Sequence, residues 1–144
     1  MTKIPAGFAP FEKSSAFLDL IGPLYAKTDE RGLVLGIRID ERHCNRRGFA
    51  HGGLLVTLAD LALGYSSGHG IDQSTALVTI NLSADFAGSA QIGEWLETHT
   101  DVQRSGGSVA FANCYLTVGD RRLVRVSGIF KVVSLPASPL TTAA

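Results

Sequence analysis

One carboxylate interrupts the most apolar stretch of the sequence. Asp60 is flanked by leucines and alanines, and it is the only carboxylate between Arg47 and Asp72. An uncompensated charge is costly in such surroundings, so this side chain is a candidate base or nucleophile. No Lys or Arg lies one helical turn away, which weakens an ion pair as the explanation. The alternative is a polar residue at a helix edge that reaches solvent.

The string His51-Gly52-Gly53 stands where the same apolar segment begins. Backbone N–H groups at a helix N-terminus have no partner within the helix, and they attract negative charge. Gly52 and Gly53 carry no side chain, so a ligand can approach their backbone closely. Together they form a candidate oxyanion hole for acyl chemistry. The alternative is that the glycines only permit a tight turn or close packing.

The spacing of these two features has a geometric consequence. Gly52 and Asp60 are eight residues apart, or about 12 Å along a helix that rises 1.5 Å per residue. A single carbonyl needs its oxyanion donor and its base each about 3 Å away. Two copies packed antiparallel about a two-fold axis satisfy this, because each Asp60 then faces the partner's Gly52. The sequence therefore predicts that a homodimer with two equivalent sites is required for function.

Hydrophobic periodicity predicts the elements that position these residues. A helix is expected over 11–25, capped by Ser14 or Ser15, and a long apolar helix within 48–67. Period-two alternation predicts strands over 33–40, 76–86, 92–103, 108–118 and 123–133, with a hairpin turn at Gly119-Asp120. Within 76–86, the alternation places Val78, Ile80, Leu82, Ala84 and Phe86 on one face.

This element order predicts an α+β fold, in which an antiparallel sheet wraps around a long central helix. The last four strands fit a meander of antiparallel neighbours. A helix that is apolar all round must be buried all round; the strands cover one side, and a second copy is the natural cover for the other. A single domain over 1–144 is expected, with loose tails at 1–10 and 134–144.

Composition excludes several functional classes. The 144 residues include 13 basic and 13 acidic side chains, so a basic nucleic-acid footprint is absent. Asp60 within the apolar stretch argues against a membrane span, because a mid-bilayer Asp costs roughly 2.5–3.5 kcal/mol. Cys44 and Cys114 form no CxxC pair and no zinc spacing with the histidines. A reduced, cytoplasmic setting without a metal or cofactor is expected.

These residues resemble a known family. The string Asn45-x-x-Gly48-x-x-His51-Gly52-Gly53, followed by Leu58-Ala59-Asp60, resembles the signature of hotdog-fold acyl-CoA thioesterases. The nearest resemblance is to the phenylacetate-pathway (PaaI-like) branch of the 4-hydroxybenzoyl-CoA thioesterase superfamily. The segment 79–86 resembles the strand that follows the helix in that branch. The resemblance covers roughly 33–133 and is more specific for the fold than for the substrate.

The resemblance implies a role for each residue. Asp60 matches the catalytic carboxylate, the Gly52 N–H the carbonyl donor, and Asn45 a side chain that orients the thioester or the water. His51 matches a histidine that shapes the loop. Thr79 matches the hydroxyl residue that positions water or steadies the carboxylate. The family uses no metal, and its members are commonly dimers of dimers.

Two of these roles have alternatives. Alternation puts Thr79 on the face opposite Val78, Ile80 and Leu82, so it points away from the helix unless a β-bulge intervenes. Asn45 is also a common former of loops and turns.

A glycine-containing segment is a candidate for the coenzyme end of the substrate. Arg104, Gly106 and Gly107 lie between two expected strands and can hold a pantetheine arm or a phosphate. An ordinary hairpin with a solvated Arg explains them equally well.

Three functions fit these observations to different degrees. The first is hydrolysis of aromatic or medium-chain acyl-CoA thioesters, with Asp60, Gly52, Asn45 and Thr79 in the catalytic site and His51, Gly53 and the Arg104 segment binding substrate. The second is a non-catalytic acyl-CoA-binding hotdog module. A hotdog hydratase ranks last, because Asp40 and His43 precede the central helix rather than lying within it.

Overall fold

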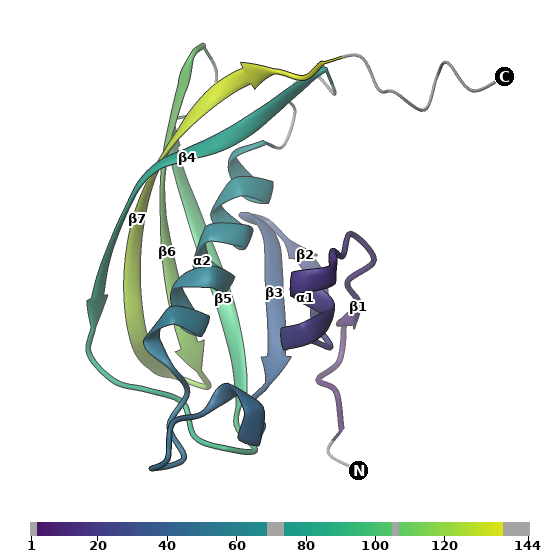
Figure 1. Ribbon diagram of the computed structural model, residues 1–144, viewed down its shortest axis with the longest axis vertical. Helices are drawn as coiled ribbons and strands as arrows, with labels where there is room; N and C mark the ends of the chain where they lie inside the picture. Colours follow the sequence, from purple (N-terminus) through teal and green to yellow (C-terminus); the bar gives the residue numbers. More distant parts are fainter. Residues whose placement is uncertain (1–2, 69–73, 105–106, 137–144) are drawn as a thin grey trace, which may run out of the picture.

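The computed structural model describes residues 3–68, 74–104 and 107–136. One antiparallel sheet curves around one long helix (Figure 1). Its strands lie in the order β1-β2-β3-β5-β6-β7-β4. Their bounds are β1 Ala9–Pro10, β2 Tyr25–Asp29, β3 Gly32–Arg38, β4 Thr75–Phe86, β5 Trp95–Arg104, β6 Val109–Val118 and β7 Arg121–Ser134. The long helix is α2 (Gly52–Ser67), and a short helix, α1 (Ala16–Ile21), lies beside β3 (Figure 1).

Helix α2 packs on the sheet with one side only. That side contacts β3, β4, β5, β6 and β7. Its buried residues are Leu55, Leu58, Ala59, Ala62, Leu63, Ser66 and Ser67. On the other side, Gly53 and Tyr65 are exposed, and a methyl group added at Gly53 or Gly64 would meet no atom within 4 Å. The described part of the chain therefore leaves one side of its most apolar helix uncovered. No helix in the described ranges is long and apolar enough to span a membrane.

The strand assignments after α2 are confirmed to within a few residues, but their expected order is wrong in one respect. β5, β6 and β7 form an antiparallel meander, and Gly119 adopts the positive φ of 55° that its hairpin turn requires. β4 does not lie next to β5 as a four-strand meander requires. Instead it pairs with β7 at the far edge of the sheet. The chain passes through α2 between β3 and β4, so α2 crosses the concave face of the sheet.

The N-terminal third differs more from the expectation. The helix predicted over 11–25 is limited to Ala16–Ile21, with Ser15 as its N-cap. Gly22 ends it, and Tyr25 opens β2, a strand that the sequence did not reveal. The expected tail 1–10 is held at its end, because Ala9–Pro10 pair with β2. At the other end β7 continues to Ser134, and residues 137–144 lie outside the described ranges.

Strand β4 contains one extra residue. Thr79 pairs with Phe130 on β7, and Asn81 pairs with the next residue along, Ile129. Ile80 is therefore left without its own partner, which defines a β-bulge. A bulge shifts the alternation of side chains by one position. Odd-numbered residues of β4 therefore face α2 before the bulge, and even-numbered residues face the core directly after it.

The bulge corrects the expected apolar face of β4. Leu82 and Ala84 pack against the core after the bulge, as expected. Before it, Leu77 packs against the core in place of Val78. Val78 and Ile80 instead point outward, with exposed fractions of 50% and 56%. Thr79 consequently faces α2.

A buried hydroxyl supports the middle of β3. The Leu35 N–H donates to Thr98 Oγ1 over 3.0 Å in a buried position. Replacing Thr98 by Val leaves this N–H without a partner, so the free energy of unfolding is expected to fall by about 1–3 kcal/mol. Urea unfolding at fixed protein concentration measures the change. Thr117→Val, at a half-buried position on β6, is the control; an equal loss in both variants would contradict the explanation.

Candidate active site

Asp60 and Thr79 form a pair across α2 and β4. The Thr79 hydroxyl donates to Asp60 Oδ1 over 2.7 Å. Asp60 is half-buried and Thr79 is exposed. The bulge at Ile80 makes this contact possible, because it turns Thr79 toward the helix. Among the described residues, no basic side chain forms an ion pair with Asp60, so a helix salt bridge does not account for it.

The pair leaves groups available for chemistry. Thr79 uses its hydrogen on Oδ1 of Asp60, so the hydroxyl oxygen can still accept a hydrogen bond. Oδ2 of Asp60 can accept another. Two acceptors side by side can hold both hydrogens of one water molecule and leave its lone pair free to attack. The same carboxylate oxygen can alternatively act directly as a nucleophile.

The N-terminus of α2 lacks a side-chain cap. His51 is the N-cap, but its side chain makes no hydrogen bond to the first turn. Its backbone N–H donates to the His43 carbonyl, which fixes the approach to the helix. Gly52 lies under the ring of Phe86, whereas Gly53 faces open space. The first N–H groups of α2 can therefore serve an anionic ligand or a developing oxyanion.

A hollow of about 440 Å³ adjoins this helix start. Its lining residues are Asn45, Arg47, Phe49, Ala50, Gly52, Leu55, Phe86, Gly88 and Ser89. Asn45 and Gly52 are thus brought together, as the sequence predicts for two site residues. Phe86 is not among the site residues predicted from the sequence, because its contact with Gly52 depends on how β4 returns along α2.

Asn45 stabilises the loop before α2, the structural role that the sequence analysis gives as the alternative to a catalytic one. Its Oδ1 accepts the N–H groups of Arg47 and Phe49 at 2.9 and 3.3 Å. Its side-chain NH₂ group remains for a ligand in the hollow.

His43 is a structural residue that holds the loop leading to the start of α2. It is buried, its Nδ1 accepts the Asp40 N–H at 2.9 Å, and its Nε2 contacts the Ile21 carbonyl at 2.6 Å. Both ring nitrogens are thereby used in holding the loop before α2. An acid–base histidine of a hydratase needs a free nitrogen, so this geometry argues against the third function considered above.

Neither cysteine suits a nucleophilic role. Burial, with a smaller contribution from the Asp40 carboxylate, raises the pKa of Cys44 above its ordinary value. Burial raises the pKa of Cys114 to about 12. The reactive form of cysteine is the thiolate, which both environments disfavour. Among the described residues, no three His, Cys, Asp or Glu side chains gather as a metal site requires.

The remaining expected site residues lie apart. Gly52 and Asp60 are separated by two turns of the same helix, as the spacing requires. Arg104 is the last residue of β5, a strand that ends near the C-terminal end of α2 (Figure 1), and Gly107 lies in the turn before β6. Gly106 lies outside the described residues. A single chain thus unites Asp60 with Thr79 and Gly52 with Asn45, but it does not unite the two pairs.

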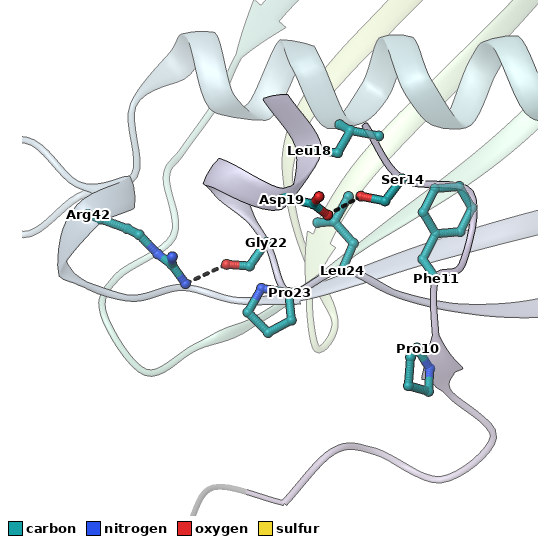
Figure 2. Close-up of a pocket in the computed structure, with 9 residues that line it drawn as sticks. All are labelled: Pro10, Phe11, Ser14, Leu18, Asp19, Gly22, Pro23, Leu24 and Arg42. Carbon is teal, nitrogen blue, oxygen red and sulfur yellow. Dashed lines mark hydrogen bonds between the residues drawn. The ribbon is translucent and has the colours of Figure 1, made fainter. Parts of the chain in front are cut away.

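A second hollow, of about 370 Å³, lies between α1 and the segment before it (Figure 2). Apolar side chains such as Phe11, Leu18 and Leu24 line it. The Arg42 guanidinium donates to the Gly22 carbonyl at its edge. It contains none of the expected site residues.

The model of the thioesterase superfamily matches residues 47–125. A protein of Pseudomonas aeruginosa named "Putative esterase PA0474" is 47% identical over 131 residues, which are 90% of this chain and 98% of that protein.

Solved structures share the fold. Zebrafish thioesterase superfamily member 2 has a TM-score of 0.73 and 22% identity, over 83% of this chain and 88% of its own. Smu.793 of Streptococcus mutans, solved with acetyl-CoA bound, has a TM-score of 0.72 and 20% identity, over 87% and 97%. The expected α+β hotdog architecture is confirmed by these likenesses.

Proposed function

The chain belongs to the thioesterase superfamily, and from that premise we propose that it hydrolyses the thioester bond of aromatic or medium-chain acyl-CoA. The observation that carries the proposal is the 2.7 Å hydrogen bond from Thr79 to Asp60. A bulge is needed to form it, and it lies beside the side of α2 that the chain leaves uncovered. Such a pair has no evident structural task, but it suits activation of water or of the carboxylate itself.

The proposed active unit is a homodimer, and two contacts within the chain support it. Along β4, Phe86 contacts Gly52 and Thr79 contacts Asp60. A two-fold axis near Val56, midway between Gly52 and Asp60 on α2, brings Gly52 beside the partner's Asp60. The same axis passes β4 between Leu82 and Ser83, so it brings Phe86 beside the partner's Thr79.

That arrangement also pairs the two β4 strands antiparallel. In the described part of the chain, β4 pairs only with β7 and therefore has an open edge. An open edge is a template for a further strand. The same two-fold axis therefore satisfies both elements, because it would cover the free side of α2 and extend the sheet at the open edge of β4.

Each of the two proposed sites combines Gly52 and Asn45 of one chain with Asp60 and Thr79 of its partner, and each residue has one task. The thioester carbonyl oxygen accepts the Gly52 N–H, where helix dipole and free N–H groups stabilise the developing negative charge. The partner's Asp60 activates water or attacks the carbonyl, and the partner's Thr79 holds that carboxylate and the water. Asn45 orients the thioester through its NH₂ group. His51 and Gly53 shape the approach, while Arg104, Gly106 and Gly107 contribute to substrate binding.

Assembly beyond the dimer and location complete the proposal. We expect a dimer of dimers, because the outward face of the sheet carries exposed apolar side chains at Val78, Ile80 and Phe111. Light scattering tests this stoichiometry. A cytoplasmic setting, the phenylacetate-pathway branch and catalysis without a cofactor belong to the same proposal.

The direct test is release of free thiol from a panel of acyl-CoA thioesters. Wild-type protein should release thiol from at least one aromatic or medium-chain member well above the uncatalysed rate. Calorimetry with the same panel gives the comparison. Binding without thiol release across the panel would replace the proposed enzyme by a non-catalytic acyl-CoA-binding module.

Thr79 offers a more specific prediction. Replacing Thr79 by Ala removes the hydroxyl that holds Asp60, so kcat is expected to fall about 10²-fold. Thr79→Ser keeps the hydroxyl and should retain most activity. Steady-state kinetics on a turned-over acyl-CoA makes the measurement. Equal activity of the Ala and Ser variants would remove Thr79 from the mechanism.

A further inference from the structure

A pair of buried hydroxyl groups joins α2 to the sheet, and the proposed mechanism makes no use of it. Thr100 Oγ1 on β5 donates to Ser66 Oγ on α2 over 2.8 Å. The two residues are only 3% and 8% exposed. Ser66 also lies against the turn between β2 and β3, since a methyl group on Gly32 would stand 3.5 Å from its Oγ. Apolar side chains would avoid the cost of burying hydroxyl groups, so stability alone does not explain the pair.

The apolar contacts of α2 do not fix the rotation of the helix about its own axis. Leu58 is buried, and Leu54 and Leu61 on the flank beside it are half-buried against the same core. A modest turn that buried Leu54 and Leu61 more deeply would exchange one apolar contact for another, and apolar burial has no preferred direction. Successive residues of a helix are about 100° apart. By that spacing, the same turn would carry Asp60 away from β4.

Such a turn would break the contact on which the proposed mechanism depends. A carboxylate stands roughly 5 Å from the axis of its helix, so a rotation of about 20° displaces it by about 2 Å. A misplacement of about 1 Å costs about 10²-fold in rate. The hydrogen bond from Thr79 to Asp60 lies where water competes for both groups, so it holds the helix only weakly.

The bond from Thr100 to Ser66 has the properties that the exposed bond lacks. A hydrogen bond is directional, and breaking this one would leave a buried hydroxyl without a partner, which is costly. Ser66 and Asp60 stand on one helix, about 9 Å apart along its axis and about 120° apart around it. Holding Ser66 toward β5 therefore also holds Asp60 toward β4.

We propose that Thr100 and Ser66 are positioning residues, which set the rotation of α2 and thereby direct Asp60 to Thr79. Buried polar pairs select one packing arrangement among similar ones in some proteins. The inference rests on the proposed function and adds two residues to it. Both hydroxyl groups are buried between α2 and the sheet and do not touch substrate. Their removal should therefore lower kcat and leave KM nearly unchanged.

Thr100→Val tests the role of the hydroxyl. The substitution keeps the shape of the side chain but removes the donor, so kcat for an acyl-CoA that wild type hydrolyses should fall about 10- to 30-fold. KM should stay within about twofold of the wild-type value. Thr100→Ser retains a hydroxyl and should keep at least about half of the wild-type kcat. Unaltered kcat in Thr100→Val, or a loss in Thr100→Ser as large as in Thr100→Val, would overturn the proposal.

Thr98→Val is the matched control. Thr98 stands two residues earlier on β5 and is equally buried, but its hydroxyl accepts the Leu35 N–H of β3 instead of bonding to α2. Both Val variants should lower the melting temperature, whereas only Thr100→Val should lower kcat. An equal loss of kcat in Thr98→Val, measured well below both melting temperatures, would reduce Thr100 to a general stabilising residue and contradict the proposal.

Ser66→Ala tests the other half of the pair. This variant should lower kcat by a factor similar to that of Thr100→Val. The double variant should be no slower than either single one, because all three lack the same bond. Losses that multiply in the double variant would mean that the two hydroxyls act separately, which would refute their role as a pair.

Crystal structures separate this inference from the proposed function. In Thr100→Val, the distance from Thr79 Oγ1 to Asp60 Oδ1 should increase beyond about 3.5 Å, where a hydrogen bond is lost. In Thr98→Val it should equal the wild-type distance. If the shift occurs in a protein that releases no thiol from acyl-CoA, the hydrolase fails and the positioning role stands. If wild type hydrolyses acyl-CoA while Thr100→Val keeps both the distance and kcat, the positioning role fails and the hydrolase stands.

Discussion

Replacing Asp60 by Asn is expected to lower kcat for acyl-CoA hydrolysis about 10³- to 10⁴-fold. The amide keeps the shape of the side chain, and its oxygen can still accept the Thr79 hydroxyl. What disappears is the negative charge and with it the ability to take a proton or attack the carbonyl. Thiol release by wild type and variant measures the effect, and thermal unfolding confirms that the fold is retained.

A second variant separates position from charge. Asp60→Glu keeps the carboxylate but moves it by one methylene, and a displacement of about 1 Å costs about 10²-fold when geometry matters. It should therefore lie between wild type and Asp60→Asn. An Asp60→Asn protein that is well folded and fully active would refute the proposed mechanism.

Replacing Gly52 by Pro is expected to lower kcat about 10²- to 10³-fold, the usual effect of losing one oxyanion donor. Gly52 is the first residue of α2, where the N–H has no partner in the helix and proline is well tolerated. His51 has φ −62° and ψ 137°, a conformation compatible with a following proline. The substitution thus removes the one N–H while leaving the helix start in place.

Gly52→Ala is the matched control for this change. Its methyl group makes the same close approach to Phe86, at 3.1 Å, but the N–H remains. It should retain much more activity than Gly52→Pro. Comparable losses in the two variants would attribute the effect to crowding and remove the N–H from the mechanism.

The two variants together test whether the site is shared. A heterodimer of Asp60→Asn with Gly52→Pro contains one site with both defects and one with neither. Unfolding and refolding the inactive proteins together should therefore restore thiol release, up to half the sites in each heterodimer. Lack of recovery despite mixed dimers, shown by mass spectrometry, would mean that each chain holds its own site.

The parts of the site that are local in sequence could be predicted, and those that depend on distant pairing could not. Asp60 and Gly52 stand on one helix, so residue spacing alone shows that a single chain cannot unite them. The position of β4 was predicted wrongly because its partner residues on β7 lie 38 to 59 positions later in the chain, and nothing near 75–86 encodes that pairing.

The bulge was hidden by the composition of the strand. Val78 and Ile80 are apolar although they point outward, so the apolar alternation runs on unbroken into Leu82. Only the pairing of Thr79 and Asn81 with adjacent residues of β7 reveals the extra position. The contact of Phe86 with Gly52 could not be predicted either, because it depends on the path of β4 along α2. A bulky aromatic at the end of a strand, just before Ala87-Gly88, is a weak signal of such a contact.

The extra residue in β4 makes the chemistry sensitive to the register of the first half of the strand. If that half slipped by one residue along β7, so that Ile80 rather than Thr79 paired with Phe130, the bulge would vanish while the second half kept its packing. Val78 and Ile80 would then face α2, and the Thr79 hydroxyl would point away from Asp60. A descendant with that slip would carry an intact acidic side chain and a ligand cleft but no hydroxyl beside it. Turnover would be lost in such a lineage without any change at Asp60 or Thr79, leaving a protein that only carries or senses its ligand.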